Sequence, residues 1–232
     1  MGPVLEQGRC GSCWAFAALT PLEGTMVLRQ REAQAEEGIT DPTELAQWRG
    51  LSKQHQVDCT FVNSPQDLAA EFNFDSSYIK NYGCGGGRQD WTWEFIKKYG
   101  AMWEDNYRSY ASGNTLLEGD CEHRGGKNAA IKVKDWYKVQ PNPHAIKREL
   151  KKAPLAVAIG AASKLYGYKS GVIEQGDESW CTANLNHAVT LVGYTPGELE
   201  SRTTTTQVVP QCRRKLKKDA DGCRKKGEYT WE

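Results

Sequence analysis

One stretch constrains this chain more than any other: Gln7-Gly8-Arg9-Cys10-Gly11-Ser12-Cys13-Trp14-Ala15-Phe16. Apolar residues recur near a helical period from Cys13 onward, which predicts a helix over residues 13–30. The thiol of Cys13 then lies at the helix N-terminus, where unpaired backbone N–H groups favour the ionised form of a thiol. Gln7 adds a side-chain amide six residues upstream. The stretch therefore predicts a thiol nucleophile with a hydrogen-bond donor close by.

Composition limits the alternatives. The chain has 232 residues, 39% apolar and 25% charged, which predicts one large domain or two small packed ones and excludes a fibrous or disordered protein. No apolar stretch reaches the roughly 20 residues that span a bilayer. A net charge of +1 gives no general attraction to nucleic acid. The eight dispersed cysteines favour disulfides and an oxidising compartment over a zinc site, so no metal or cofactor is expected.

The order of elements predicts an α+β fold. The first half reads as helical, with a short helix from Ser52 to Cys59, an inserted loop over 60–83 and a helix over 90–98. The second half reads as a helix over 145–152 and strand-like runs over 131–139, 155–159 and 188–194, which indicates a small sheet or barrel. A second insertion covers about 195–227.

A thiol nucleophile needs an imidazole, and His187 is the best candidate. It opens the apolar strand Ala188-Val189-Thr190-Leu191-Val192. His55, His123 and His144 lie in polar contexts and are expected at the surface. Cys10 and Cys13 also form a C-x-x-C pair, so a thiol-disulfide oxidoreductase is a competing interpretation, although no βαβ unit surrounds the motif.

Six motifs in order resemble the papain family of cysteine proteases across nearly the whole chain. Besides the Cys13 stretch they are 51–59, Gly83-Cys84-Gly85-Gly86-Gly87, Tyr107-Arg108-Ser109-Tyr110 before Cys121, 154–159 and the His187 strand. The resemblance implies a two-lobed fold with the active site in the cleft between the lobes. Residues 1–126 would form a helical lobe, and residues 127–232 an antiparallel β-barrel lobe.

The family pattern implies a role for each matching residue. Cys13 would be the nucleophile, His187 its imidazolium partner, and the Gln7 amide with the Cys13 backbone N–H the oxyanion donors. The substrate-binding positions implied in the same way are Gly87, Arg88, Gln89, Ala158, Leu185, Asn186 and Ala188. Arg88 departs from the apolar residue usual at its position. It either tunes the cleft toward an acidic or polar side chain or points to solvent.

The resemblance also implies disulfides between Cys10 and Cys84 and between Cys59 and Cys121. Cys212 and Cys223 could pair within the second insertion, and Cys181 resembles a family cysteine whose mate lies further downstream. The family's Asn-Ser-Trp-Gly segment is missing, because no Asn follows His187. The family's enzymes also begin earlier, with a propeptide and a signal peptide. We interpret both differences as truncation.

The sequence therefore predicts a papain-like cysteine endopeptidase, with a non-catalytic relative that binds peptides or inhibitors as the alternative. Expected partners are peptide or protein substrates and cystatin-type or propeptide inhibitors, with no nucleic acid and a monomeric chain. The basic segment 213–226 either binds an acidic polysaccharide or is a solvated insertion. A lysosomal, vacuolar or extracellular location follows from the resemblance.

Overall fold

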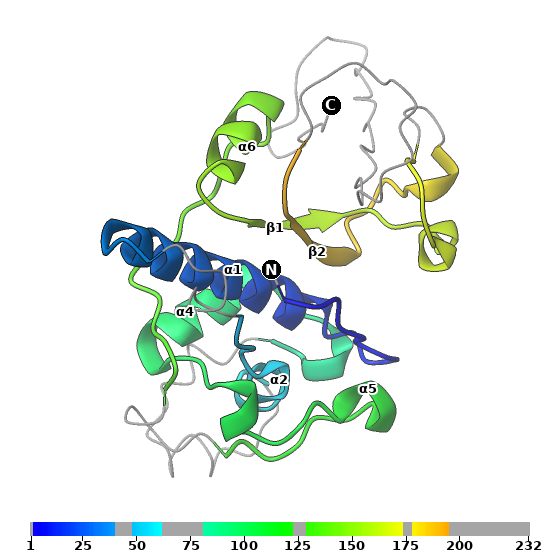
Figure 1. Cartoon of the computed structure of the whole chain (residues 1–232). Helices are drawn as coiled ribbons and strands as arrows, with labels where there is room; N and C mark the ends of the chain where they lie inside the picture. The colour runs from blue at the N-terminus through cyan, green and yellow to red at the C-terminus, as the bar shows by residue number, and fades with distance from the viewer. Residues whose placement is uncertain (1, 40–47, 62–80, 123–128, 174–177, 195–232) are drawn as a thin grey trace, which may run out of the picture.

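The computed structural model describes residues 2–39, 48–61, 81–122, 129–173 and 178–194 (Figure 1). Its longest helix, α1 (Cys13–Glu36), lies between a group of helices and a pair of strands. The other helices and strands are α2 (Lys53–Cys59), α4 (Gln89–Tyr99), α5 (Ser112–Thr115), α6 (Pro143–Leu150), β1 (Leu155–Ile159) and β2 (His187–Leu191). Short 3-10 helices are η2 (Gly83–Gly85), η3 (Glu104–Asn106), η4 (Ser163–Gly167) and η5 (Glu178–Trp180). The predicted α+β class is confirmed.

Helix α1 is the centre of the fold, because it packs against α2, α4, β1 and β2. Its first half is therefore buried around most of its circumference rather than along one stripe, and Pro21 lies within it. The helix begins at Cys13 as predicted, but it continues past the predicted end at residue 30 to Glu36. The added residues are mostly exposed Arg, Glu, Ala and Gln, which are good helix formers without a core contact.

Helix α2 matches its sequence prediction. The Ser52 hydroxyl accepts a hydrogen bond from the His55 backbone N–H at 3.1 Å, which is the expected N-cap. All seven residues of α2 are buried, including its polar ones. The helix therefore sits inside the helical half rather than on its surface.

The two strands pair antiparallel, with Leu155 opposite Leu191 and Ile159 opposite His187. β1 has its predicted bounds, and β2 begins one residue earlier than predicted. Before β1, helix α6 begins at Pro143 after an Asn142 side chain that accepts the Ala145 N–H at 2.9 Å. Among the described residues the sheet has these two strands.

The predicted strand over residues 131–139 is wrong. Its one ladder contact in the described chain is an isolated bridge between Ala101 and Ile131. The side chains that made the segment look like a strand pack elsewhere: Ile131 and Val133 cover the core cluster around Leu19 and Ile96. Trp136 Nε1 donates to Glu94 on α4 at 2.6 Å. The segment thus covers helices instead of joining the sheet.

Some predictions concern residues outside the described ranges. These are most of the 60–83 loop, His123, the 195–227 insertion, and the proposed Cys212–Cys223 pair. In the part of the chain that the structure describes, no helix is both long and apolar enough to cross a membrane.

A buried ion pair joins α1 to the segment that starts α2. Lys53 Nζ donates to Glu23 Oε1 at 2.5 Å, and the two side chains are only 2% and 3% exposed. The same carboxylate accepts the Leu51 backbone N–H at 2.7 Å and Trp48 Nε1 at 3.0 Å. Every oxygen of Glu23 is thus used, so the pair's desolvation cost is offset by several hydrogen bonds.

We predict that Lys53→Met destabilises the chain by about 3–5 kcal/mol, because it leaves a buried carboxylate without its cation. The double variant Glu23→Gln with Lys53→Met should recover part of the loss, since the amide oxygen still accepts the Leu51 N–H although its NH2 group then faces the Trp48 N–H. Urea unfolding measures both. Breaking the exposed Arg49–Asp105 pair by Arg49→Met is the control and should cost at most about 1 kcal/mol. A double variant as unstable as the single one would contradict the prediction.

Candidate active site

Cys13 is the first residue of α1, and it is the free cysteine of the described chain. Its thiol is partly buried. The preceding Ser12 does not cap the helix with its side chain. Its hydroxyl instead lies 2.6 Å from the Tyr110 hydroxyl. The backbone N–H groups of the first turn therefore keep their partial positive charge beside the thiol.

A disulfide fixes the loop before Cys13. Cys10 is bonded to Cys84 across 74 residues, and the Gly11 N–H donates to the Cys84 carbonyl at 3.0 Å. A Cβ on Gly11 would lie 2.5 Å from that carbonyl oxygen, so the close approach requires glycine. Because Cys10 is bonded to Cys84, it does not form a redox pair with Cys13. The oxidoreductase interpretation is therefore wrong.

The second implied disulfide, between Cys59 and Cys121, is also present. It ties the end of α2 to the chain that follows α5. Cys181 is disulfide-bonded as well. Its mate lies outside the described residues, so the pairing of this cysteine stays a prediction.

Gln7 is held near the start of α1 by contacts through both its backbone and its side chain. Its Nε2 donates to the Cys10 carbonyl at 3.0 Å, and its own carbonyl accepts the Tyr110 hydroxyl at 2.9 Å. Since Tyr110 also bonds Ser12, one phenol links the Gln7 loop to the residue before the thiol. A primary amide has two N–H donors, so the second stays available for a ligand.

His187 opens β2, opposite Ile159. Its side chain is partly buried, and burial lowers the pKa of the imidazole from its ordinary value of 6.5. The Tyr166 ring lies 6.2 Å from it, centroid to centroid. In the described part of the chain, no hydrogen bond joins the imidazole to the Cys13 thiol. The helix and the strand that carry them nevertheless pack together (Figure 1).

The residues implied in substrate binding come from both sides of this contact. Gln89, at the start of α4, donates through Nε2 to the Val157 carbonyl of β1 at 3.4 Å. Ala158 and Ala188 face each other across the two strands. Leu185, before β2, is 57% exposed. A Cβ on Gly87 would meet Asn81 Oδ1 at 2.4 Å, so packing also requires that glycine.

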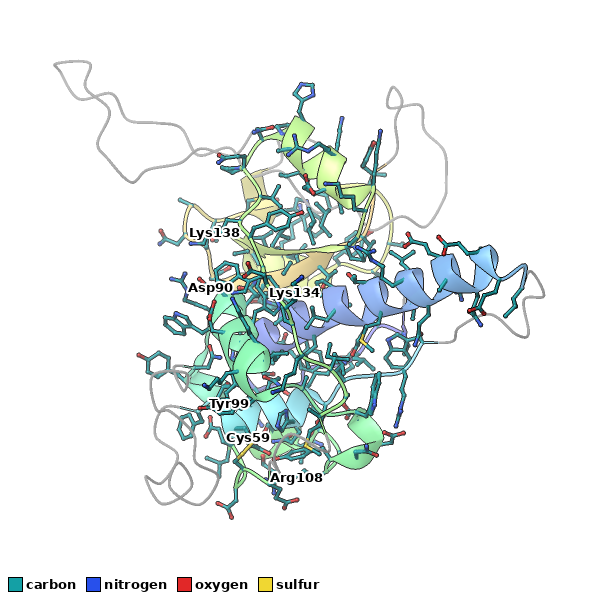
Figure 2. All side chains as sticks on the ribbon, turned by 90° about the vertical axis from the view of Figure 1, so that its left-hand side faces the viewer. Cys59, Asp90, Tyr99, Arg108, Lys134 and Lys138 are labelled. Atoms are coloured by element: carbon teal, nitrogen blue, oxygen red, sulfur yellow. A yellow bond between two sulfur atoms is a disulfide. The ribbon has the colours of Figure 1, made fainter. Side chains whose placement is uncertain are left out.

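Arg88 is paired within the chain. Its Nε and Nη2 donate to the two oxygens of Asp90 at 2.9 and 2.5 Å, and its guanidinium lies 5.1 Å from the Trp91 ring centroid. Figure 2 shows Asp90 at the end of α4 nearest the strands. Although burial opposes it, the guanidinium lowers the pKa of Asp90. The side chain of Arg88 is half exposed, but its charge is already neutralised.

Asn186 has a structural explanation for its position. Its Oδ1 accepts the Ala161 N–H at 2.8 Å, and its Nδ2 donates to the Ala161 carbonyl at 2.9 Å. Its backbone N–H donates to the Ile159 carbonyl at 3.0 Å. These bonds align the start of β2 with the end of β1 and so orient the backbone of His187.

Sequence reasoning misjudged His55 and overlooked two other residues. His55 was expected at the surface but is fully buried, because α2 is enclosed on every side and the Phe95 and Tyr107 rings contact it. Tyr110 was noticed only as part of a motif. Asn81, whose Oδ1 accepts the Arg88 N–H at 2.8 Å, had no local signal. Tyr110 acts on the Gln7 backbone 103 residues away, whereas Asn81 acts on backbone only 7 residues further along the chain.

No cluster of His, Cys, Asp or Glu within the described ranges has the arrangement of a metal site. The helix and strands that pack together carry a free thiol at Cys13, an imidazole at His187 and small apolar side chains. On an α+β fold, this combination is typical of the cysteine-protease class.

Comparison with known proteins narrows that class. The model of the papain family of cysteine proteases matches residues 1–207, and this chain belongs to that family. It is 31% identical over 198 residues to "Probable cysteine protease RD21C" of Arabidopsis thaliana, covering 84% of this chain and 35% of the relative. It is 28% identical over 192 residues to Vignain of Vigna mungo, covering 82% and 42%. The chain thus spans less than half the length of these relatives.

Solved structures show the same fold. The cysteine protease CMS1MS2 of Carica candamarcensis, crystallised with E-64, has a TM-score of 0.56 at 23% identity, over 84% of this chain and 72% of that one. Digestive procathepsin L 3 of Tenebrio molitor has a TM-score of 0.59 at 26% identity, over 85% and 53%.

We predict that His187 titrates below pH 6.5 when Cys13 is capped as a neutral methyl disulfide, because burial then acts alone on the imidazole. NMR titration of the imidazole protons measures this, with His187→Gln used to assign the signal. A midpoint at or above 6.5 for His187 in the capped chain would show that burial does not control it.

Proposed function

We propose that this chain carries the catalytic groups of a papain-like cysteine endopeptidase. The observation that supports this most directly is the free Cys13 at the first position of α1, on a helix packed against the strand that His187 opens. Cys13 and His187 come from opposite halves of the chain. No core requirement explains a partly buried free thiol at that helix end.

In the proposed reaction, the Cys13 thiolate attacks the scissile carbonyl and His187 carries the proton as an imidazolium. The resulting oxyanion accepts hydrogen bonds from the Cys13 backbone N–H and from the free N–H of the Gln7 amide. His187 then protonates the leaving amine, and an acyl-enzyme remains on Cys13. Water, deprotonated by the neutral imidazole, hydrolyses this thioester and releases the acid.

Burial lowers the pKa of the His187 imidazole as long as the Cys13 thiol is neutral. Ionisation of Cys13 would add an anion next to it and raise the imidazole pKa, so the two groups stabilise each other's charged forms. Transfer of the thiol proton to His187 requires that the Cys13 sulfur and the imidazole come within hydrogen-bond distance of each other.

The proposed active site also implies which molecules would bind to this chain. We propose peptide substrates lying between Gly87–Gln89 and the two strands, and inhibitors that bind at the same place. The Carica candamarcensis cysteine protease named above was crystallised in complex with E-64. Cystatin-type and propeptide inhibitors belong to this proposal. The disulfides support a vacuolar, lysosomal or extracellular location. Binding of acidic polysaccharide by 213–226 is a further proposal on residues outside the described ranges.

We predict that iodoacetamide alkylates Cys13 at about pH 5, where a thiol with the ordinary pKa of about 8.5 is almost fully protonated. His187→Ala should slow this alkylation by about a hundredfold or more, because the ion pair is lost. His144→Ala is the matched control, since it removes an exposed imidazole from α6. Mass spectrometry of the Cys13 peptide gives the rates. A wild-type profile that follows a single midpoint near 8.5 would contradict the proposed pair.

The non-catalytic alternative predicts a different pattern in a companion assay. A catalytic chain should hydrolyse a fluorogenic peptide in a reaction that Cys13→Ser abolishes. A binding protein should hold the peptide with similar affinity before and after Cys13→Ser without releasing the fluorophore. Peptide binding shows that the chain is folded. A loss of hydrolysis with binding retained therefore reports a failure of the ion pair and not of the fold.

We predict that the Arg88–Asp90 pair sets the preference for the second residue before the cut. The wild-type chain should prefer Leu over Glu there, because Asp90 already neutralises Arg88. Asp90→Asn should raise the affinity for a Glu-containing peptide aldehyde, relative to its Leu analogue, about fivefold through the freed guanidinium. Asp105→Asn frees the unrelated Arg49 in the same way and should change nothing. An equal ratio in wild type and Asp90→Asn would place Arg88 outside the cleft.

A further inference from the structure

A cavity of about 280 Å³ lies beside the helical half, and neither Cys13 nor His187 lines it. Its walls are Leu5, Glu6, Phe16, Trp48, Gly50, Lys53, Glu104 and Tyr110. At about 30 Å³ for each water-sized group, it has room for a small organic molecule. It is therefore large enough to be a ligand site in its own right.

The charges around the cavity do not cancel. Lys53 contributes the one cation of the wall, and that cation is bonded to Glu23. The neighbouring Arg49 is bonded to Asp105 through two hydrogen bonds of 2.8 and 2.9 Å. Among the described residues, the structure shows no ion pair of its own for either Glu6 or Glu104, and Lys53 attracts Glu104 only from its bond to Glu23. The site thus has a net negative charge.

Glu104 is the residue of the cavity wall that most clearly indicates which kind of ligand would bind. Within the described part of the chain, its Oε2 is buried and has no hydrogen-bond partner. Its carboxylate does receive a backbone hydrogen bond from Lys53. Burial raises the pKa of Glu104, and the attraction of Lys53 offsets only part of that effect. A buried acceptor without a donor is costly, so a ligand that donates to it would gain free energy.

The aromatic walls favour the same kind of ligand. Trp48 uses its indole N–H on Glu23, and Tyr110 uses its hydroxyl on Ser12 and Gln7. With their polar groups engaged, Trp48, Tyr110 and Phe16 offer the cavity mainly ring surface. Aromatic rings attract cations through their negative faces and pack against apolar groups.

We propose that this cavity binds a small organic ammonium, with the apolar part of the ligand against Phe16, Trp48 and Tyr110 and its N–H donors directed to Glu104. The proposal is independent of the proteolytic function, since it rests on residues that take no part in the proposed reaction chemistry. It assigns to the helical half a binding site of its own.

The test uses the full chain and benzylammonium as the probe, with neutral benzyl alcohol as its near-isosteric control. Saturation-transfer NMR and isothermal titration measure binding. We expect benzylammonium to bind at least about tenfold more tightly than the alcohol, from one charge-assisted hydrogen bond and the cation–π contacts. Cys13 carboxymethylated beforehand should bind the probe equally well.

Glu104→Gln should lower the affinity for benzylammonium about tenfold and leave that for benzyl alcohol unchanged. Asp135→Asn is the control, because it removes the same charge from a side chain that does not line the cavity. If Glu104→Gln fails to fold, two measurements still test the proposal. They are the affinity of Glu6→Gln for benzylammonium and the comparison of the two probes on the wild-type chain. Equal binding of both probes, no binding of either, or an unchanged affinity in Glu104→Gln would overturn the proposal.

Discussion

The carboxylate of Glu23 is the interaction on which the rest of this structure depends. It lies in the middle of α1 and accepts hydrogen bonds from Lys53, Leu51 and Trp48 at once. These bonds help to set the position of α2, which is buried on all sides and has one apolar side chain, Val57, packed against Trp14 and Ala15. A buried ion pair orients its partners more than it stabilises them, because desolvation removes much of its attraction. Glu23 thus determines how the helical half is arranged more than how stable it is.

The candidate site depends on the same helix. α1 packs against the helices and against both strands, and its first residue is Cys13. The Cys10–Cys84 disulfide and the Tyr110 hydroxyl hold the residues around that end, and the Gln89 bond joins α4 to β1. The proposed nucleophile is therefore placed by an element whose position is fixed by packing. Functional groups supported in this way stay aligned without a strong contact between them.

Short-range sequence signals correctly predicted the helix and strand ends that depend on neighbouring residues. The Ser52 cap, the start of α1 at Cys13 and the bounds of β1 follow from short-range chemistry, and all were confirmed. The prediction of a strand over residues 131–139 was wrong. An extended segment whose apolar side chains cover a helix has the same composition as a strand, so composition does not separate the two. His55 and Tyr110 could not be assigned, since their partners lie far away in sequence. The disulfides came from the family resemblance and not from cysteine spacing, which leaves many pairings open.

The neighbouring cysteines 10 and 13 impose opposite demands on the surroundings of the protein. The proposed catalysis requires Cys13 as a thiol, whereas the disulfide from Cys10 to Cys84 ties the glycine-rich turn over 83–87 to the residues just before α1. A reductant strong enough to open the disulfide would release that turn. An oxidant strong enough to modify Cys13 would block the proposed nucleophile. Under this proposal the chain would work only within a bounded range of thiol–disulfide conditions, and its environment would regulate its chemistry.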